Sequence, residues 1–127
     1  MSPLPIENRV ELFFIKKGYY IMWFRDRYGR NIELTEERWQ HIIKEHPELK
    51  GLKNKIGEVL LDPDYIKRSK RDPEVELFYK FKSDLYNGKF LLVPVKINKR
   101  CFFLTAYITD TIRKGDTRYD KKTENVL

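Results

Sequence analysis

The spacing of apolar residues divides the chain into a strand-rich start, a helical middle and a strand-rich second half. Short apolar runs separated by turn sequences predict strands at 10–15, 19–25 and 31–34. Between 35 and 61, apolar residues recur every three or four positions, which is typical of amphipathic helices. From residue 65 the apolar period becomes two, and strands are predicted at 65–69, 75–82, 90–98 and 101–109.

Two helices are predicted in the middle segment, separated by Pro47. Thr35 suits the N-cap of the first helix because its hydroxyl can accept hydrogen bonds from first-turn amides. Glu36 and Glu37 follow it and complement the positive end of the helix dipole. Pro47 disfavours helical geometry in the residue before it, so the first helix ends there. The second helix is predicted over 49–61.

Strands, two helices and then an antiparallel meander together predict an α+β fold, with the helices packed on one face of the sheet. Alternation along the last strand predicts which residues face the helices and which face away. The helix-facing set is Phe102, Leu104, Ala106 and Ile108, and the opposite set is Phe103, Thr105, Tyr107 and Thr109. The polar residues from Gly115 onward are expected to form a loose tail.

The composition is that of one folded domain. The chain has 127 residues, of which 41% are hydrophobic and 14% aromatic. The charged fraction of 35% is common in proteins from hot environments. A single cysteine, Cys101, excludes an intramolecular disulfide and a cysteine-based zinc cluster. No apolar stretch is long enough for a membrane span and no signal-peptide layout is present, so we expect a cytoplasmic protein.

The net charge of +7 is concentrated in one part of the chain. Residues 64–100 contain 10 Lys or Arg against 5 Asp or Glu, a net of +5. A basic region of this kind attracts phosphates and speeds encounter with nucleic acid. The ordinary alternative is that the charge only keeps a small protein in solution, and the composition favours neither interpretation.

The two histidines, His41 and His46, lie in the same predicted helix. Histidine gives and takes protons near neutral pH, so the two are a candidate acid/base pair. Their five-residue spacing places them about 140° apart on an ideal helix, which opposes a shared site unless the helix ends before His46. This spacing also differs from the HExxH pattern of zinc hydrolases. The ordinary alternatives are a solvated His41 and a buried, structural His46.

The predicted strands bring further polar residues together. Lys96 lies in an otherwise apolar strand and is expected to stand beside Thr105 and Tyr107 across the hairpin. Tyr79 and Lys80 come from the preceding strand. The alternative is a solvent-facing sheet surface of Thr, Tyr and Lys, which is common.

In combination, five segments are more specific than any one of them. These are TEERWQHII (35–43), HPE (46–48), LFYK (77–80), VPVKI (93–97) and TAYITD (105–110). In this order they resemble the phage-type branch of the barnase–EndoU–colicin–RelE nuclease superfamily (BECR). The resemblance covers about residues 21–115, with an N-terminal arm and short strand (1–20) and a polar tail (116–127) outside it. It implies N-terminal helices on a curved antiparallel sheet and endoribonuclease activity without a metal or other cofactor. It also implies a toxin or a phage or mobile-element effector, with RNA as substrate and a protein antitoxin or immunity partner.

The resemblance also implies roles for particular residues. The catalytic set that it indicates is His41, His46, Lys96, Thr105 and Tyr107, and the substrate-binding set is Tyr79, Lys80 and Arg113. In such a site a histidine transfers the proton, a cation stabilises the charge on the phosphate, and hydroxyl groups position it. Which histidine is essential stays open. The alternative from a different class is a non-catalytic nucleic-acid-binding domain on the same fold.

Overall fold

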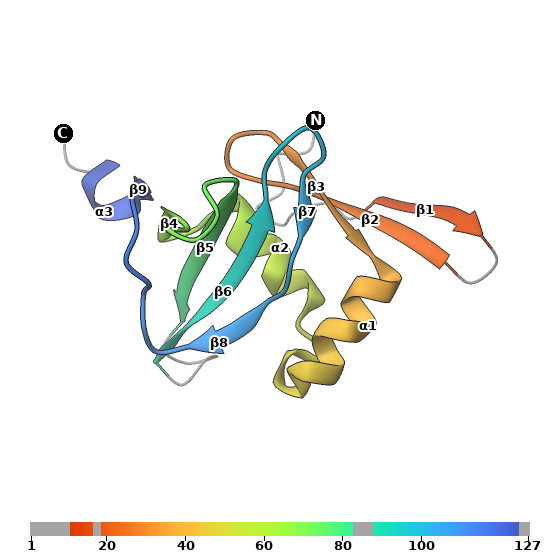
Figure 1. Ribbon diagram of the computed structural model, residues 1–127. Coiled ribbons are helices and arrows are strands. Elements are labelled where there is room, and N and C mark those ends of the chain that lie inside the picture. Colours follow the sequence, from red (N-terminus) through yellow and green to blue (C-terminus); the bar gives the residue numbers. More distant parts are fainter. Residues whose placement is uncertain (1–10, 17–18, 83–87, 125–127) are drawn as a thin grey trace, which may run out of the picture.

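The computed structural model describes residues 11–16, 19–82 and 88–124 and has an α+β fold, as predicted (Figure 1). The first half of the chain contains β1 (Glu11–Lys16), β2 (Tyr19–Arg25), β3 (Asn31–Thr35), α1 (Glu36–Glu45), the 3-10 turn η1 (Pro47–Leu49) and α2 (Lys53–Leu61). The second half contains β4 (Tyr65–Arg68), β5 (Val75–Lys82), β6 (Lys89–Lys96), β7 (Phe102–Phe103), β8 (Tyr107–Thr109), β9 (Thr117–Asp120) and α3 (Lys121–Glu124).

The described strands form one large sheet in the order β1-β2-β3-β7-β6-β5-β4-β9, with β8 also paired to β6. The neighbours are antiparallel except β3 and β7, which meet in parallel at Glu33 and Phe102. The resemblance implies a curved sheet, whereas the observed sheet is mostly antiparallel and not curled. The sequence Asn87-Gly88 predicts a hairpin turn between β5 and β6, but Asn87 lies outside the described residues.

The predicted start and end of α1 are confirmed. The Thr35 hydroxyl accepts a hydrogen bond from the Arg38 backbone N–H at 3.0 Å. Pro47 begins η1, and α1 ends at Glu45 with His46 as the C-cap residue. The second helix is shorter than predicted, because Gly51 takes a positive φ of 86° and separates η1 from α2.

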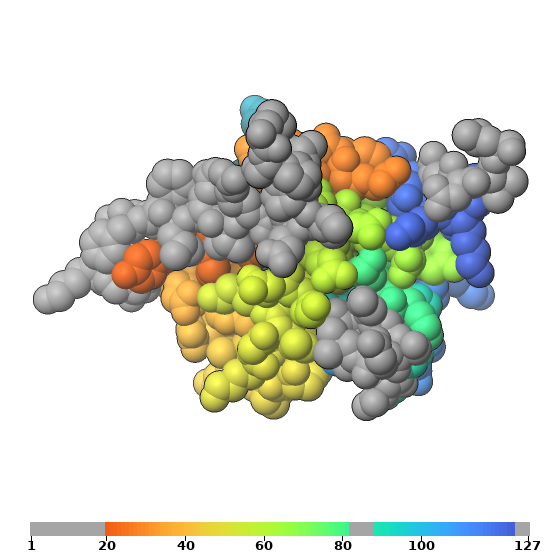
Figure 2. All heavy atoms as spheres, turned by 180° about the vertical axis from the view of Figure 1, so that it is seen from behind, coloured from red at the N-terminus to blue at the C-terminus, as the bar shows by residue number. Residues whose placement is uncertain are grey.

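Both main helices cover the same face of the sheet and form the core against it. Figure 2 views the molecule from behind and shows α1, η1 and α2 (yellow to green) gathered over this face. Buried apolar side chains from the helices and the central strands form one cluster, which includes Trp39, Ile42, Ile56, Leu60, Phe78, Leu91, Val93 and Phe103. A second, smaller cluster lies on β5 and β6 and contains Val75, Leu77, Tyr79 and Leu92. Because side chains alternate along a strand, the two clusters lie on opposite faces of the sheet.

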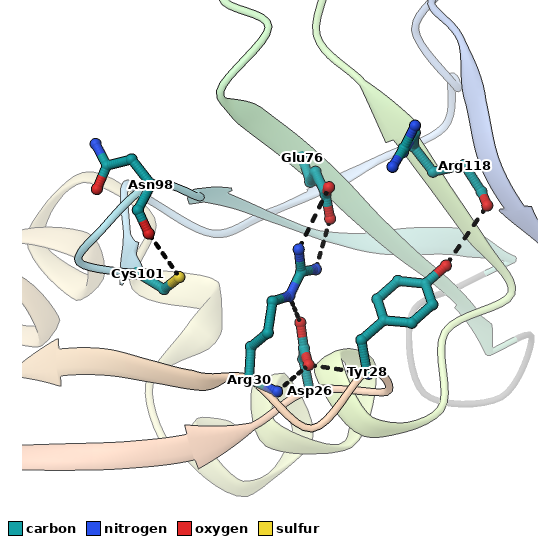
Figure 3. Close-up of polar contacts among 7 residues, drawn as sticks. All are labelled: Asp26, Tyr28, Arg30, Glu76, Asn98, Cys101 and Arg118. Atoms are coloured by element: carbon teal, nitrogen blue, oxygen red, sulfur yellow. Dashed lines mark hydrogen bonds and ion pairs between the residues drawn. The ribbon is translucent and has the colours of Figure 1, made fainter.

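A buried ion network joins the β2–β3 turn to β5 (Figure 3). The Asp26 carboxylate is almost completely buried and accepts hydrogen bonds from the backbone N–H groups of Tyr28 and Arg30. The Arg30 guanidinium donates to Asp26 at 2.6 Å and to Glu76 at 2.7 Å. These bonds connect segments that are 46 residues apart, so the network holds the turn against the sheet.

The expectation of a loose tail after Gly115 is wrong. Residues Thr117–Asp120 form β9, which pairs with β4 and covers an edge that would otherwise be open. Tyr119 is buried in the main core, and the Arg27 guanidinium lies 4.1 Å from the centre of its ring. One aromatic residue in a polar stretch therefore anchors this strand, and a composition argument does not detect it.

The predicted strand over 101–109 is interrupted in its middle. β6 pairs with β7 through Val95 and Phe103 and with β8 through Leu92 and Tyr107. Residues 93–94 of β6 therefore lie opposite the three residues 104–106 of the neighbouring segment, which is the geometry of a β-bulge. Pro94 lies at this point, and it has no N–H to complete the ladder.

The bulge changes the face of each side chain that precedes it. Phe103 packs in the main core, while Leu104 packs against the opposite cluster. The predicted helix-facing set was therefore wrong at Phe102 and Leu104. It was correct at Ala106 and Ile108, which pack with the main core.

Candidate functional site

The first pair of site residues comes from the end of α1 and from β8. The His46 imidazole stacks on the Tyr107 ring, with centroids 5.4 Å apart and planes at 25°. His46 reaches this position because its backbone has left helical geometry, with φ −131° and ψ 72°. Its side chain is 31% exposed, so the imidazole is accessible to a substrate. Glu48 lies on the other side, with one carboxylate oxygen 3.8 Å from Nδ1.

Arg113 joins this pair and connects it to β5. Its Nη2 donates a hydrogen bond to the Tyr107 hydroxyl at 3.1 Å, and its backbone N–H donates to the Tyr79 hydroxyl at 3.0 Å. Tyr79 is fully buried, and burial raises the pKa of its hydroxyl, so it stays neutral at physiological pH. His46, Tyr79, Tyr107 and Arg113 together form what we call the His46 cluster.

The bulge opposite Pro94 binds a second guanidinium, which comes from α1. The Leu104 backbone N–H donates to the Pro94 carbonyl, but Pro94 cannot return a hydrogen bond to the Leu104 carbonyl. Arg38 on α1 donates to that carbonyl instead, at 3.4 Å. The sequence reasoning did not identify Arg38, although a proline inside a predicted central strand is a signal that the ladder is broken there.

Thr105 lies in the same bulge, two residues from Tyr107. Its hydroxyl oxygen is buried and has no hydrogen-bond partner among the described residues. A buried hydroxyl without a partner costs free energy, so this position is unusual. The structure therefore places Thr105 next to the His46 cluster without exposing its hydroxyl.

His41 lies outside the His46 cluster. Its side chain is 57% exposed, and its Nε2 lies 3.5 Å from a carboxylate oxygen of Glu45 on the same helix. This agrees with the helical wheel, which places the two histidines on different sides of α1. α1 does end before His46, at Glu45, but the two histidines still do not share a site.

Lys96 does not stand beside Thr105 and Tyr107, and that expectation was wrong. Its ammonium group binds the carboxylates of Asp72 and Glu74. The pKa of Lys96 is raised, mainly because its ammonium group donates a hydrogen bond to Asp72. On β6, Lys96 pairs with Phe102, whereas Tyr107 pairs with Leu92. Lys96 and Leu92 are four residues apart along β6, a distance of about 13 Å. The physical reason is the strand register, which places Lys96 at the end of β6 that lies beside Asp72 and Glu74 and away from Tyr107.

Lys80 also lies apart from Tyr79, its neighbour in the chain. The two side chains point to opposite faces of β5 because strand residues alternate. Lys80 is buried on the helix-covered side, where its ammonium group donates to the Asp62 carbonyl at 2.8 Å and to the Asp62 carboxylate at 3.2 Å. Lys80 therefore holds the end of α2 against the sheet. The predicted site residues that the structure brings together are His46, Tyr107, Arg113 and Tyr79.

Within residues 11–16, 19–82 and 88–124, no group of three or more His, Cys, Asp or Glu side chains is placed to hold a metal ion. In the same part of the chain, none of the helices combines the length and the apolar character that a membrane crossing requires. Comparisons of this chain with protein family models, with curated proteins and with solved structures return no match.

Proposed function

We propose that this protein is a metal-independent endoribonuclease in which His46 transfers a proton and Arg113 binds the scissile phosphate. The observation that supports this best is the contact of three chemical groups from distant segments. An accessible imidazole stacks on a phenol, and the hydroxyl of that phenol accepts a hydrogen bond from a guanidinium. These are groups that RNA cleavage without a metal requires.

In the proposed reaction, His46 removes the proton from an RNA 2′-hydroxyl. The 2′-oxygen then attacks the adjacent phosphorus, and the bond from phosphorus to the 5′-oxygen breaks. The 5′-oxygen takes up a proton from water, and His46 afterwards returns the proton that it removed to the solvent. The products are a 2′,3′-cyclic phosphate and a 5′-hydroxyl end. Arg113 stabilises the additional negative charge on the phosphate, and the Tyr107 hydroxyl holds a non-bridging oxygen. Arg38, which is bound to the Leu104 carbonyl three residues before Tyr107, is a second candidate cation for the phosphate backbone.

The resemblance to the BECR superfamily supports the same proposal from the sequence. On this basis we propose a barnase/RelE-like arrangement of the helices and sheet, and a toxin or mobile-element effector that acts on RNA in the cytoplasm. A protein antitoxin or immunity partner would then cover the His46 cluster. Lys96, which the resemblance indicates as the stabilising cation, is replaced in this proposal by Arg113, because Asp72 and Glu74 neutralise Lys96.

The test uses purified full-length protein with a structured RNA in the presence of EDTA. We expect cleavage that leaves 2′,3′-cyclic phosphate ends and continues with the chelator. His46→Ala should reduce the rate about 10²- to 10⁴-fold. His41→Ala is the matched control, because it removes the other histidine from an exposed position on the same helix, and it should keep nearly full activity.

Equal losses in the two variants would contradict the assignment to His46. RNA binding without cleavage by the wild-type protein would instead favour the non-catalytic nucleic-acid-binding domain. In that case the salt dependence of binding would report how many phosphates the basic residues contact.

A further inference from the structure

A pocket lies at the end of the sheet where β4, β5, β6 and β9 meet. Its volume is about 510 Å³, and the lining residues are Asp64, Tyr65, Phe81, Phe90, Asp120, Lys121 and Lys122. Three of these are aromatic and form a connected group, in which the Phe90 ring lies 5.4 Å from Phe81 and 6.2 Å from Tyr65. The Phe81 side chain is 44% exposed, which is unusual for phenylalanine.

The pocket and the His46 cluster share one face of the sheet. The Phe90 ring lies 6.0 Å from the Tyr79 ring, and the Tyr79 hydroxyl accepts the backbone hydrogen bond from Arg113. The strand register also places Tyr65, Tyr79, Leu92 and Tyr107 in one row across four strands. Three strand spacings, about 14 Å, therefore separate Tyr65 at the pocket from Tyr107, the residue on which His46 stacks.

The polar groups of the pocket suit a base better than a phosphate. Asp64 accepts a hydrogen bond from the Phe81 backbone N–H at 2.7 Å, and Asp120 accepts one from the Lys122 backbone N–H at 3.0 Å. In each carboxylate the second oxygen has no partner within the described part of the chain, so it can accept another hydrogen bond. The Lys121 ammonium group is already bound to the Asp62 carboxylate. The two free carboxylate oxygens therefore disfavour a phosphate inside the pocket, whereas the N–H groups of a nucleobase donate to carboxylates.

We propose that this pocket is a second RNA subsite, which binds one unpaired base of the strand that is cleaved at the His46 cluster. The base stacks on the exposed Phe81 ring, its N–H groups donate to Asp64 or Asp120, and Lys122 at the rim attracts the adjoining backbone. Aromatic side chains bind single-stranded nucleic acid in this way. The inference rests on the proposed function for its substrate, but binding of the base does not require cleavage.

The distance between the two sites provides the test, because a dinucleotide is too short to occupy both. We compare kcat and KM for a dinucleotide and for a single-stranded oligonucleotide of about ten residues. Phe81→Ala should raise KM for the oligonucleotide about 5- to 100-fold, the loss expected for one stacked base. It should leave kcat and all dinucleotide kinetics unchanged. Phe81→Trp should keep the wild-type KM, because it retains an aromatic ring.

Tyr28→Ala is the matched control, since Tyr28 is an exposed aromatic residue on the β2–β3 turn that does not line the pocket. A parallel experiment measures the affinity of His46→Ala protein for a fluorescent oligonucleotide, with and without Phe81→Ala. If no RNA is cleaved but Phe81→Ala weakens binding, the proposed function fails and the subsite stands. If Phe81→Ala leaves oligonucleotide KM and affinity unchanged, or impairs the dinucleotide equally, the subsite is refuted.

Discussion

At the scale of single residues, His46 and His41 carry the same imidazole group but differ in their position relative to the end of α1. His46 is the last residue before Pro47, so its backbone is free to turn the imidazole onto Tyr107. His41 lies inside the helix and stays exposed beside Glu45. The position of one proline therefore separates the candidate catalytic histidine from a solvated one.

The role of Arg113 is the second prediction at this scale. Arg113→Ala should lower kcat for RNA cleavage about 10²- to 10³-fold, because it removes the group that stabilises charge on the phosphate. Lys114→Ala is the matched control, since it removes one positive charge from the neighbouring exposed residue. Equal effects of the two changes would show that Arg113 acts only through the overall positive field.

At the scale of elements, the break between β7 and β8 shapes the candidate site. Because Pro94 cannot donate to the Leu104 carbonyl, that carbonyl accepts from Arg38 on α1. The same break adds one residue opposite β6 and turns Phe103 toward the core. Because Pro94 has no N–H, Arg38 links α1 to this part of the sheet. The extra residue at the break decides on which face of the sheet the neighbouring side chains lie.

The β2–β3 turn carries a stability prediction at this scale. Asp26→Ala leaves Arg30 with Glu76 alone and removes the acceptor for two backbone N–H groups. We expect a loss of about 2–3 kcal/mol in the free energy of unfolding, below the range for fully buried pairs because Arg30 is partly exposed.

Urea denaturation followed by circular dichroism measures this loss. Asp110→Ala is the control, because this substitution removes the same charge from an exposed position. It should change the free energy of unfolding by less than about 0.5 kcal/mol. A similar stability for both variants would mean that the network does not hold the turn.

At the scale of the whole molecule, Asp62 connects three parts of the chain. It is the C-cap residue of α2 and accepts hydrogen bonds from Lys80 on β5 and from Lys121 on α3. Burial raises the pKa of Asp62, but the bonds from Lys121 and Lys80 outweigh burial and hold this pKa below its usual value of 3.8. The ionised carboxylate is therefore favoured in the folded state.

This pKa shift predicts how stability depends on pH. The contribution of Asp62 is fully present above pH 3.8 and is lost as the pH falls through the lower pKa of the folded state. Asp62→Asn should lower Tm at pH 7 and make the decrease of Tm below pH 4 less steep. Asp110→Asn, at an exposed position, is the control and should follow the wild-type curve. Parallel curves for wild type and Asp62→Asn would contradict the prediction.

The sequence by itself determined the local structure and part of the site. The apolar period predicts α1 and most strands, and Thr35 and Pro47 mark the limits of α1, because caps and periodicity act over a few residues. His46, Tyr79, Tyr107 and Arg113 were all candidates before the structure was known.

Only the tertiary structure decided which candidates meet. Arg113 reaches Tyr107 and Tyr79, while Lys96 is neutralised by Asp72 and Glu74 from another loop. The polar end of the chain became β9 because β4 offered an open edge and Tyr119 fits the core. These outcomes depend on contacts between segments far apart in the chain, whose partners no local pattern specifies.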